Sequence, residues 1–200
     1  MPFLRGEPSG EEDVRRVVRL GFELARARRR RLTSVDKANV LATSRLWRKV
    51  VDEVAPEFAD VEVEHRLVDA CAMQLVKSPA VFDVMVMENT FGDILSDVAA
   101  GVTGGLGLAP SASLGDGRPG LFEPVHGSAP DIAGTGAANP TAMLRSLVMA
   151  LELGVDEPGL ALRLRQAIDV AIATVPTPDL GGAATTREFG DAVLAALEVR

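Results

Sequence analysis

The stretch FGDILSD places two carboxylates, Asp93 and Asp97, four residues apart and just after the apolar segment VFDVMVM. Residues four apart on a helix share one face, so these side chains are expected to point the same way. Two like charges held close together are unfavourable unless a cation neutralises them, and carboxylate ligands suit Mg²⁺ or Mn²⁺. From spacing alone, a solvated helix face or an N-terminal cap is the more common explanation. The spacing does not decide whether Asp69 joins the pair as a third carboxylate.

Lys37 lies in SVDKANVL, where a predicted strand meets a polar loop. Functional residues of α/β proteins gather at the carboxyl ends of strands, and a lysine beside a metal cluster can act as a base. An exposed lysine without a function is the simpler alternative. Of the two histidines, His65 flanks a predicted strand and is expected to be structural. His126 opens the segment HGSAPDIAGTGAAN, where it could stack on a ligand or bond to it.

Residues 127–139 are rich in glycine and alanine, which allow the backbone to approach a flat ligand closely. The dinucleotide-binding pattern G-x-G-x-x-G is absent from this segment. Asp131 could accept hydrogen bonds from ribose hydroxyls, and its charge would repel a 2′-phosphate. On composition alone, a tight structural loop is an equally good explanation.

The elements that position these residues are predicted strands that alternate with predicted helices. This alternation predicts an α/β architecture. Strands are expected to end near Ser34, to include Val61 and Val63, and to cover residues 82–87 as a buried parallel strand. Residues 101–139 lack periodicity and are expected to form a long loop region.

Helical spacing of apolar residues predicts helices over residues 11–29, 44–54, 69–77, 91–101, 140–153, 159–175 and 186–197. A capping box from Ser9 to Glu12 is expected to begin the first helix. Gly101 is expected to close the helix that carries the two aspartates, and Thr186 is expected to cap the last one.

The composition is that of an ordinary soluble protein. Of the 200 residues, 47% are hydrophobic and 24% charged, which suits one large domain or two small ones. The net charge of −7 argues against a nucleic-acid partner, and the basic run at residues 25–31 ends a predicted helix. Cys71 is the only cysteine, so we expect a buried thiol and no disulfide within the chain. No run resembles a signal peptide or a membrane span, so a cytoplasmic location without a membrane partner is expected.

Six segments occur in a characteristic order: SVDKANVL, VDACAMQLV, ENTFGDILSD, LAPSASLG, LFEPVHGSAPDIAGTGAANP and PDLGG. Together they resemble the isocitrate/isopropylmalate family of β-decarboxylating dehydrogenases, over nearly the whole chain. The resemblance implies an isopropylmalate-dehydrogenase-like two-domain α/β fold that lacks its N-terminal half. Residues 1–102 would form the central dimerisation and metal-site domain, and residues 103–200 the C-terminal part of the NAD-binding domain.

The implied reaction is the NAD-dependent oxidative decarboxylation of a small 2-hydroxy acid. The favoured substrate is 3-isopropylmalate of leucine biosynthesis, with tartrate, malate or homoisocitrate as alternatives. By the same resemblance, Asp93 and Asp97 bind Mg²⁺ or Mn²⁺. Asp69 would be a third ligand, contributed by the neighbouring subunit of a homodimer. Lys37 would also cross the dimer and take the proton from the substrate hydroxyl.

Substrate contacts are implied for Lys37, Val40 and Asp69. Cofactor contacts are implied for a larger set, namely Asn39, Glu123, His126, Gly127, Ser128, Ala129, Pro130, Asp131, Ile132 and Asn139. Ile132 stands where NADP-dependent members place a polar or basic residue, so the resemblance favours NAD.

The chain also departs from the family pattern. Met1 falls near the middle of that pattern, so the arginines that grip the substrate carboxylates are expected to lie outside this sequence. The family's proton-donating tyrosine precedes its G-E-P motif, but Leu4 holds that position here and the chain has no tyrosine. The arm after the motif is short. The chain alone is therefore expected to be inactive or weakly active. The alternatives are a non-catalytic module that dimerises and binds NAD, and one half of a split enzyme.

Overall fold

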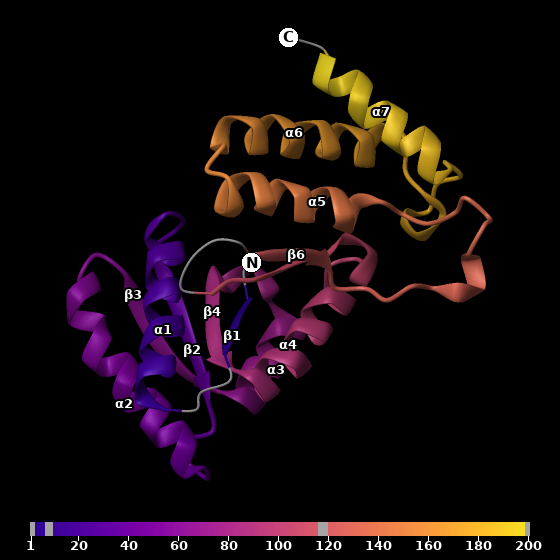
Figure 1. Cartoon of the computed structure of the whole chain (residues 1–200). Helices are drawn as coiled ribbons and strands as arrows, with labels where there is room; N and C mark the ends of the chain where they lie inside the picture. Colours follow the sequence, from indigo (N-terminus) through magenta and orange to yellow (C-terminus); the bar gives the residue numbers. More distant parts are fainter. Residues whose placement is uncertain (1–2, 7–9, 116–119, 199–200) are drawn as a thin grey trace. The chain divides into compact units, whose positions relative to one another are not determined.

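The structure is a computed structural model that describes residues 3–6, 10–115 and 120–198. The chain divides into two compact units, Met1–Val102 and Thr103–Arg200 (Figure 1). The first unit is built around a parallel sheet, and the second is mainly helical with a small antiparallel sheet. The expected α/β architecture is therefore confirmed.

In the described residues, the sheet of the first unit has four strands in the order β1, β4, β2, β3. Their bounds are Phe3–Gly6 for β1, Arg31–Asp36 for β2, Glu62–Leu67 for β3 and Val84–Glu88 for β4. Every pairing is parallel, so the carboxyl ends of the strands lie at the same edge of the sheet. The expected buried parallel strand is β4, and β2 runs two residues beyond the expected end because Asp36 still pairs with Leu67.

Two layers of helices cover the sheet: α1 (Glu11–Arg26) and α2 (Ala42–Val54) on one face, α3 (Val68–Lys77) and α4 (Asn89–Val102) on the other (Figure 1). The alternation of side chains along β4 divides its residues between the two cores. Val84 and Val86 pack with α1 and α2, whereas Met85 and Met87 pack with α3 and α4. A strand buried on both faces reads as a continuous apolar run in the sequence.

The ends of two helices differ from the expectation. α1 ends at Arg26 rather than near residue 29, because Arg30 takes a left-handed backbone conformation (φ 60°) and donates to the Ala25 carbonyl. Its N-cap is Gly10, which has no side chain to cap the helix. Ser9, on which the expected capping box depends, lies outside the described residues. α4 passes through Gly101 and ends at Val102, so the expected glycine stop is wrong.

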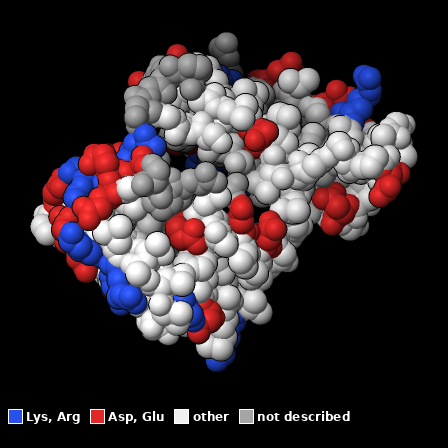
Figure 2. Space-filling view, turned by 60° about the horizontal axis from the view of Figure 1, so that its bottom comes forward, with Lys and Arg blue, Asp and Glu red and all other residues white. Residues whose placement is uncertain are grey.

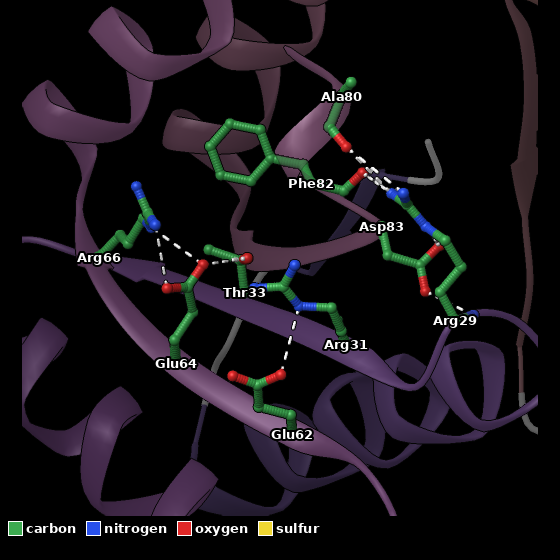
Figure 3. A network of polar contacts seen from close by, with 9 residues as sticks. All are labelled: Arg29, Arg31, Thr33, Glu62, Glu64, Arg66, Ala80, Phe82 and Asp83. Atoms are coloured by element: carbon green, nitrogen blue, oxygen red, sulfur yellow. Dashed lines mark hydrogen bonds and ion pairs between the residues drawn. The ribbon is translucent and has the colours of Figure 1, made fainter. Parts of the chain in front are cut away.

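A network of polar contacts joins the start of β4 to the end of α1 and links β2 to β3 (Figure 3). Arg29 donates to the Phe82 carbonyl and, through its backbone N–H, to the buried Asp83. On the neighbouring strands, Glu64 accepts hydrogen bonds from Thr33 and Arg66. These contacts tie β2 to β3 and hold the chain before β2 against the chain before β4.

Acidic and basic side chains are interspersed on the surface of the first unit. Pairs such as Arg15 with Glu53 and Arg19 with Glu57 join α1 to α2 and to the short 3₁₀ helix that follows α2, Ala55–Phe58. On the face in Figure 2, the Lys and Arg side chains lie among Asp and Glu, and the described residues there form no broad basic patch.

The second unit packs three α-helices around a shared core. They are α5 (Thr141–Met149), α6 (Pro158–Thr174) and α7 (Thr186–Glu198), with a π-helical turn, Ala150–Gly154, after α5. Their core includes Val148, Ile168 and Phe189. Thr186 is the first residue of α7 and not its cap, because the hydroxyl of Thr185 accepts the helix N–H of Glu188.

The region expected to be one long loop contains a small sheet. β5 (Pro110–Ser113) and β6 (Leu121–Pro124) pair antiparallel, and short 3₁₀ turns lie at Leu106–Leu108 and Pro130–Ile132. Strands of four residues that begin or end in proline are too short to leave a recognisable alternation in the sequence. Among the described residues, no helix is both long and apolar enough to cross a membrane.

Candidate functional site

Three of the residues singled out in the sequence follow parallel strands at the same edge of the first unit. Lys37 comes directly after β2, and Asp69 is the second residue of α3, which follows β3 without a loop. Asp93 lies in the first turns of α4, which follows β4 in the same way. Because parallel strands end at one edge, positions that are far apart in the sequence become neighbours there.

The closest of these neighbours are Lys37 and Asp69. The Lys37 Nζ donates a hydrogen bond to Asp69 Oδ1 at 2.6 Å. The lysine side chain is 24% exposed and the aspartate 66% exposed, so the pair lies at the surface with the lysine more enclosed. The hydrogen bond from Lys37 lowers the pKa of the Asp69 carboxyl below its ordinary value. The arrangement therefore presents an ion pair to solvent at the carboxyl edge of the sheet.

The turn after β2 exposes Asn39 and Val40, two further candidate site residues. The Lys37 carbonyl accepts hydrogen bonds from the N–H groups of Val40 and Leu41, both at 2.9 Å, which closes the turn just before α2. Asn39 is exposed and lines an open pocket, and the Val40 side chain is 65% exposed. An apolar side chain this exposed beside an ion pair is free to contact a ligand.

Asp93 and Asp97 share the exposed face of α4, as their spacing predicts. Leu95, between them, points the other way and is fully buried in the core beneath the helix. The two carboxylates thus lie on the wet side of an amphipathic helix, and their oxygen donors match the preference of Mg²⁺ or Mn²⁺. Within the described part of one chain, no three His, Cys, Asp or Glu side chains come together as a metal site. A single chain therefore does not unite Asp69 with Asp93 and Asp97.

In the second unit, the candidate cofactor residues begin on β6. Glu123 is exposed and pairs in register with Ser111 of β5. His126 follows the strand, and its Nδ1 lies 2.8 Å from the carbonyl oxygen of Gly127. This contact turns the imidazole back toward the loop that starts there.

Every residue of the loop from 127 to 136 is exposed. Ala129 holds a left-handed conformation (φ 43°, ψ 62°) and caps the short turn Pro130–Ile132, which carries Asp131. Farther along, Gly134 and Gly136 also have positive φ, where a side chain would be strained. Gly127, Ser128, Asp131 and Ile132 all face solvent, so this segment presents backbone and a carboxylate to any flat ligand.

The far end of the loop is tied to the C-terminal part of the unit. Asn139 donates from its side-chain amide to Asp179 at 2.9 Å, and accepts the N–H of Thr141 at the start of α5. The Thr186 hydroxyl donates to the carbonyls of Gly136 and Ala138. Asp179 and Thr186 were not among the residues singled out for the site. The PDLGG motif that contains Asp179 was the available signal.

His65 and Cys71, the other two residues considered in the sequence, both lie in the packed part of the first unit. The Nε2 of His65 lies 2.9 Å from Asp52, which joins β3 to α2. Cys71 is buried in the core beneath α3 and α4, and burial raises the pKa of its thiol to about 12. The environment of Cys71 is therefore not that of a nucleophile, which needs an accessible and deprotonated thiol.

A model of the isocitrate/isopropylmalate dehydrogenase family matches residues 7–193. Two proteins named 3-isopropylmalate dehydrogenase are close in sequence. That of Streptococcus pneumoniae is 51% identical, covering 93% of this chain and 54% of the relative, and that of Nitratidesulfovibrio vulgaris is 60% identical, covering 82% and 45%. The chain spans about half the length of the curated relatives it matches.

Two solved structures of dehydrogenases are also similar to this chain in fold and sequence. The isocitrate dehydrogenase from Methylococcus capsulatus superposes with a TM-score of 0.87 at 45% identity, over 94% of this chain and 57% of that one. A β-decarboxylating dehydrogenase from Thermococcus kodakarensis gives a TM-score of 0.85 at 41% identity, over 94% and 56%.

Proposed function

Because the chain belongs to the isocitrate/isopropylmalate dehydrogenase family, we propose that it carries the base, the metal ligands and the NAD loop of a dehydrogenase that oxidises and decarboxylates 3-isopropylmalate. The observation that carries this proposal is the ion pair of Lys37 and Asp69 at the carboxyl edge of the sheet. The names of the relatives favour 3-isopropylmalate as the substrate. By the resemblance of the sequence, the reaction would belong to leucine biosynthesis.

Lys37 is the residue proposed to move a proton. In its neutral form, Nζ would accept the proton of the substrate hydroxyl while the hydride leaves the adjoining carbon. In the free chain Lys37 Nζ donates to the Asp69 carboxylate. A cation that bound Asp69 would compete for the oxygen that Nζ contacts. The pair would therefore link metal binding to the position of Lys37.

Asp93, Asp97 and Asp69 are proposed to hold Mg²⁺ or Mn²⁺, since all three are exposed carboxylates near the same sheet edge. The bound cation would polarise the carbonyl formed by oxidation and stabilise negative charge as CO₂ departs. Glu123, His126 and the loop through Asn139 are proposed to bind NAD, which accepts the hydride. Asp131 is exposed at the turn of that loop and is suited to accept hydrogen bonds from ribose hydroxyls.

We also propose that two copies of the chain pair through α3 and α4. Met73 and Val76 on α3 and Ile94 on α4 are more than half exposed, at 66%, 65% and 56%. Exposed apolar side chains on adjacent helices are typical of helices that pack against a second copy. Pairing would allow Asp69 and Lys37 of one copy to meet Asp93 and Asp97 of the other, which no single chain unites.

The test is NADH formation by the purified chain with 3-isopropylmalate, NAD and Mg²⁺. Lys37→Ala should abolish the reaction, whereas Lys77→Ala, an exposed lysine at the end of α3, should leave it unchanged. The same assay with the N-terminal half of the Streptococcus pneumoniae relative added tests for a complementing partner. Equal activity of the wild type and Lys37→Ala would contradict the role of Lys37.

As a second candidate function, the chain would be a dimerising module that binds NAD and Mg²⁺ without turnover, or one half of a split enzyme. The exposed apolar side chains of α3 and α4 and the exposed loop at residues 127–136 favour the module. Binding of NAD measured by calorimetry, together with absent NADH formation in the assay above, would favour the module. Activity that appears only with the added N-terminal half would favour the split enzyme.

A further inference from the structure

Asp36 is a charged residue buried in the sheet. It is the last residue of β2, and it is 1% exposed. A buried carboxylate is unfavourable unless its oxygens are fully paired. Here the guanidinium of Arg48 binds both oxygens, from Nε to Oδ2 and from Nη2 to Oδ1, each at 2.9 Å. Such two-pronged contacts are stronger and more directional than a single ion pair.

The Asp36 carboxylate also holds the backbone directly after Lys37. Its Oδ1 accepts the N–H of Ala38 at 2.9 Å, which turns the chain immediately after the strand. The N–H of Lys37 itself donates to Ser44 Oγ at 3.0 Å. Ser44 therefore holds the N–H of Lys37, and Asp36 holds the N–H that follows it. These bonds add to the two that the Lys37 carbonyl accepts within the turn.

One helix supplies both partners. Ser44 and Arg48 are four residues apart on α2 and so share the face that meets the end of β2. On the other side, the Nδ1 of His65 lies 3.9 Å from Asp36 Oδ2. The contacts converge on the one turn that carries Lys37, although the packing of α2 is already secured by its apolar face, with Trp47, Val50 and Val51 in the core.

We propose that Asp36, Ser44 and Arg48 form an anchor that positions Lys37 for catalysis. The anchor fixes the backbone of Lys37, so that its Nζ stays within reach of Asp69 and of the substrate hydroxyl. The inference rests on the proposed role of Lys37 as the base. Asp36, Ser44 and Arg48 touch neither substrate nor cofactor in this proposal and act only through the lysine.

The first test measures the position of Lys37 without catalysis. The chain has three lysines, Lys37, Lys49 and Lys77, so acetylation by an N-hydroxysuccinimide ester can be followed at each by mass spectrometry. In the wild type, Lys37 should react slowly, because it is largely enclosed and is bonded to Asp69. In Asp36→Asn and Arg48→Met, Lys37 should react severalfold faster, while the rate at Lys77 stays the same.

Ser44→Ala is the milder variant, because it removes only the partner of the Lys37 N–H and leaves the buried ion pair intact. It keeps the test valid if the two charge variants fail to fold. Arg48→Lys keeps the charge but cannot bind both carboxylate oxygens with a planar guanidinium. The acetylation rate of Lys37 in this variant should therefore lie between the rates in the wild type and in Arg48→Met. Arg19→Met removes an exposed ion pair of α1 with Glu57 and serves as the matched control with unchanged labelling at Lys37.

The second readout is the rate of NADH formation. Loss of positioning should lower kcat by about 10²-fold with little change in the KM for NAD, since a small displacement of a reacting group has an effect of this size. If the wild type makes no NADH even with the N-terminal half of the relative added, the proposed function fails, but the labelling rates still test the anchor. Unchanged labelling of Lys37 in folded Asp36→Asn and Ser44→Ala would overturn the inference. An equal increase at all three lysines would also overturn it, because that result reports general loosening.

Discussion

Asp83 accepts the backbone N–H of Arg29 at 2.8 Å, although its own side chain has no exposed surface. Arg28 adds a second hydrogen bond to the same carboxylate, from Nε at 3.0 Å. Asp83 lies directly before β4, and the two arginines follow α1. One buried carboxylate therefore holds the chain leaving the first helix against the start of a central strand (Figure 3).

This relationship predicts how stability depends on pH. Burial by itself would raise the pKa of Asp83, but the hydrogen bonds from Arg28 and Arg29 outweigh it and leave the pKa below its ordinary value of 3.8. A carboxyl with a lowered folded-state pKa stabilises the fold above its ordinary pKa and ceases to do so as the pH falls through the lowered value. Asp83→Asn should thus lower the free energy of unfolding by about 2 kcal/mol at pH 7.

The pH dependence separates this charge effect from a loss of packing. Urea denaturation of the wild type and Asp83→Asn should give midpoints that converge as the pH falls below 3.8. Other carboxyls with lowered pKa values, such as Glu64, destabilise both proteins in acid and cancel in the comparison. A difference in midpoint that stays constant down to low pH would rule out the charge explanation.

Gly182 in the PDLGG motif should tolerate no side chain. A Cβ there would lie 1.9 Å from the carbonyl oxygen of Pro176, which belongs to the backbone and cannot rotate away. Gly182→Ala should destabilise the second unit by about 3 kcal/mol. Gly190, within α7, has open space around its Cβ position, so Gly190→Ala should stabilise by about 1 kcal/mol. Thermal denaturation of both variants would check the contrast, and a neutral Gly182→Ala would refute it.

Thr185 and Glu188 form a reciprocal capping box at the start of α7. The N–H of Thr185 donates to the Glu188 carboxylate at 2.8 Å, and the N–H of Glu188 donates to the Thr185 hydroxyl at 3.2 Å. Thr185→Ala should lower stability by about 1 kcal/mol, whereas Thr185→Ser should retain most of it. Equal losses in the two variants, measured by urea denaturation, would show that the hydroxyl is not the cause.

Cys71 should not react with thiol reagents while the protein is folded. Burial raises the pKa of its thiol to about 12, so almost no reactive thiolate exists near neutral pH. Ellman's reagent should release no colour from the native chain and one equivalent after unfolding in urea, because Cys71 is the only cysteine. Rapid colour release from the native chain would place the thiol in an open environment instead.

The long elements could be predicted from the sequence because their burial repeats over several turns. The apolar face predicted for the helix over residues 44–54 is the buried face of α2. Of its predicted members, Trp47, Val50, Val51 and Val54 are buried, and Leu46 is half-buried against the same core. The continuous run through β4 predicted a strand covered on both sides, and both of its faces are buried. The helix carrying Asp93 and Asp97 was likewise expected, with its two carboxylates on one face.

The rest depended on partners that are distant in the sequence. The ion pair between Lys37 and Asp69 joins residues 32 positions apart, and only the parallel pairing of β2 with β3 brings them together. The burial of Asp36 has no local signal either, because Arg48 arrives from the next helix. β5 and β6 were missed because four residues give an alternation too little length.

β1 has a consequence beyond completing the sheet. Phe3–Gly6 pairs along one side of β4, between Met85 and Glu88, and thereby occupies its backbone N–H and C=O groups on that side. Without β1, a strand with four consecutive fully buried side chains would present those groups unpaired. Unprotected strands of this kind recruit other chains and aggregate. Pairing by Phe3–Gly6 therefore also protects the protein against aggregation, and substitutions in this strand should be judged by aggregation as well as by activity.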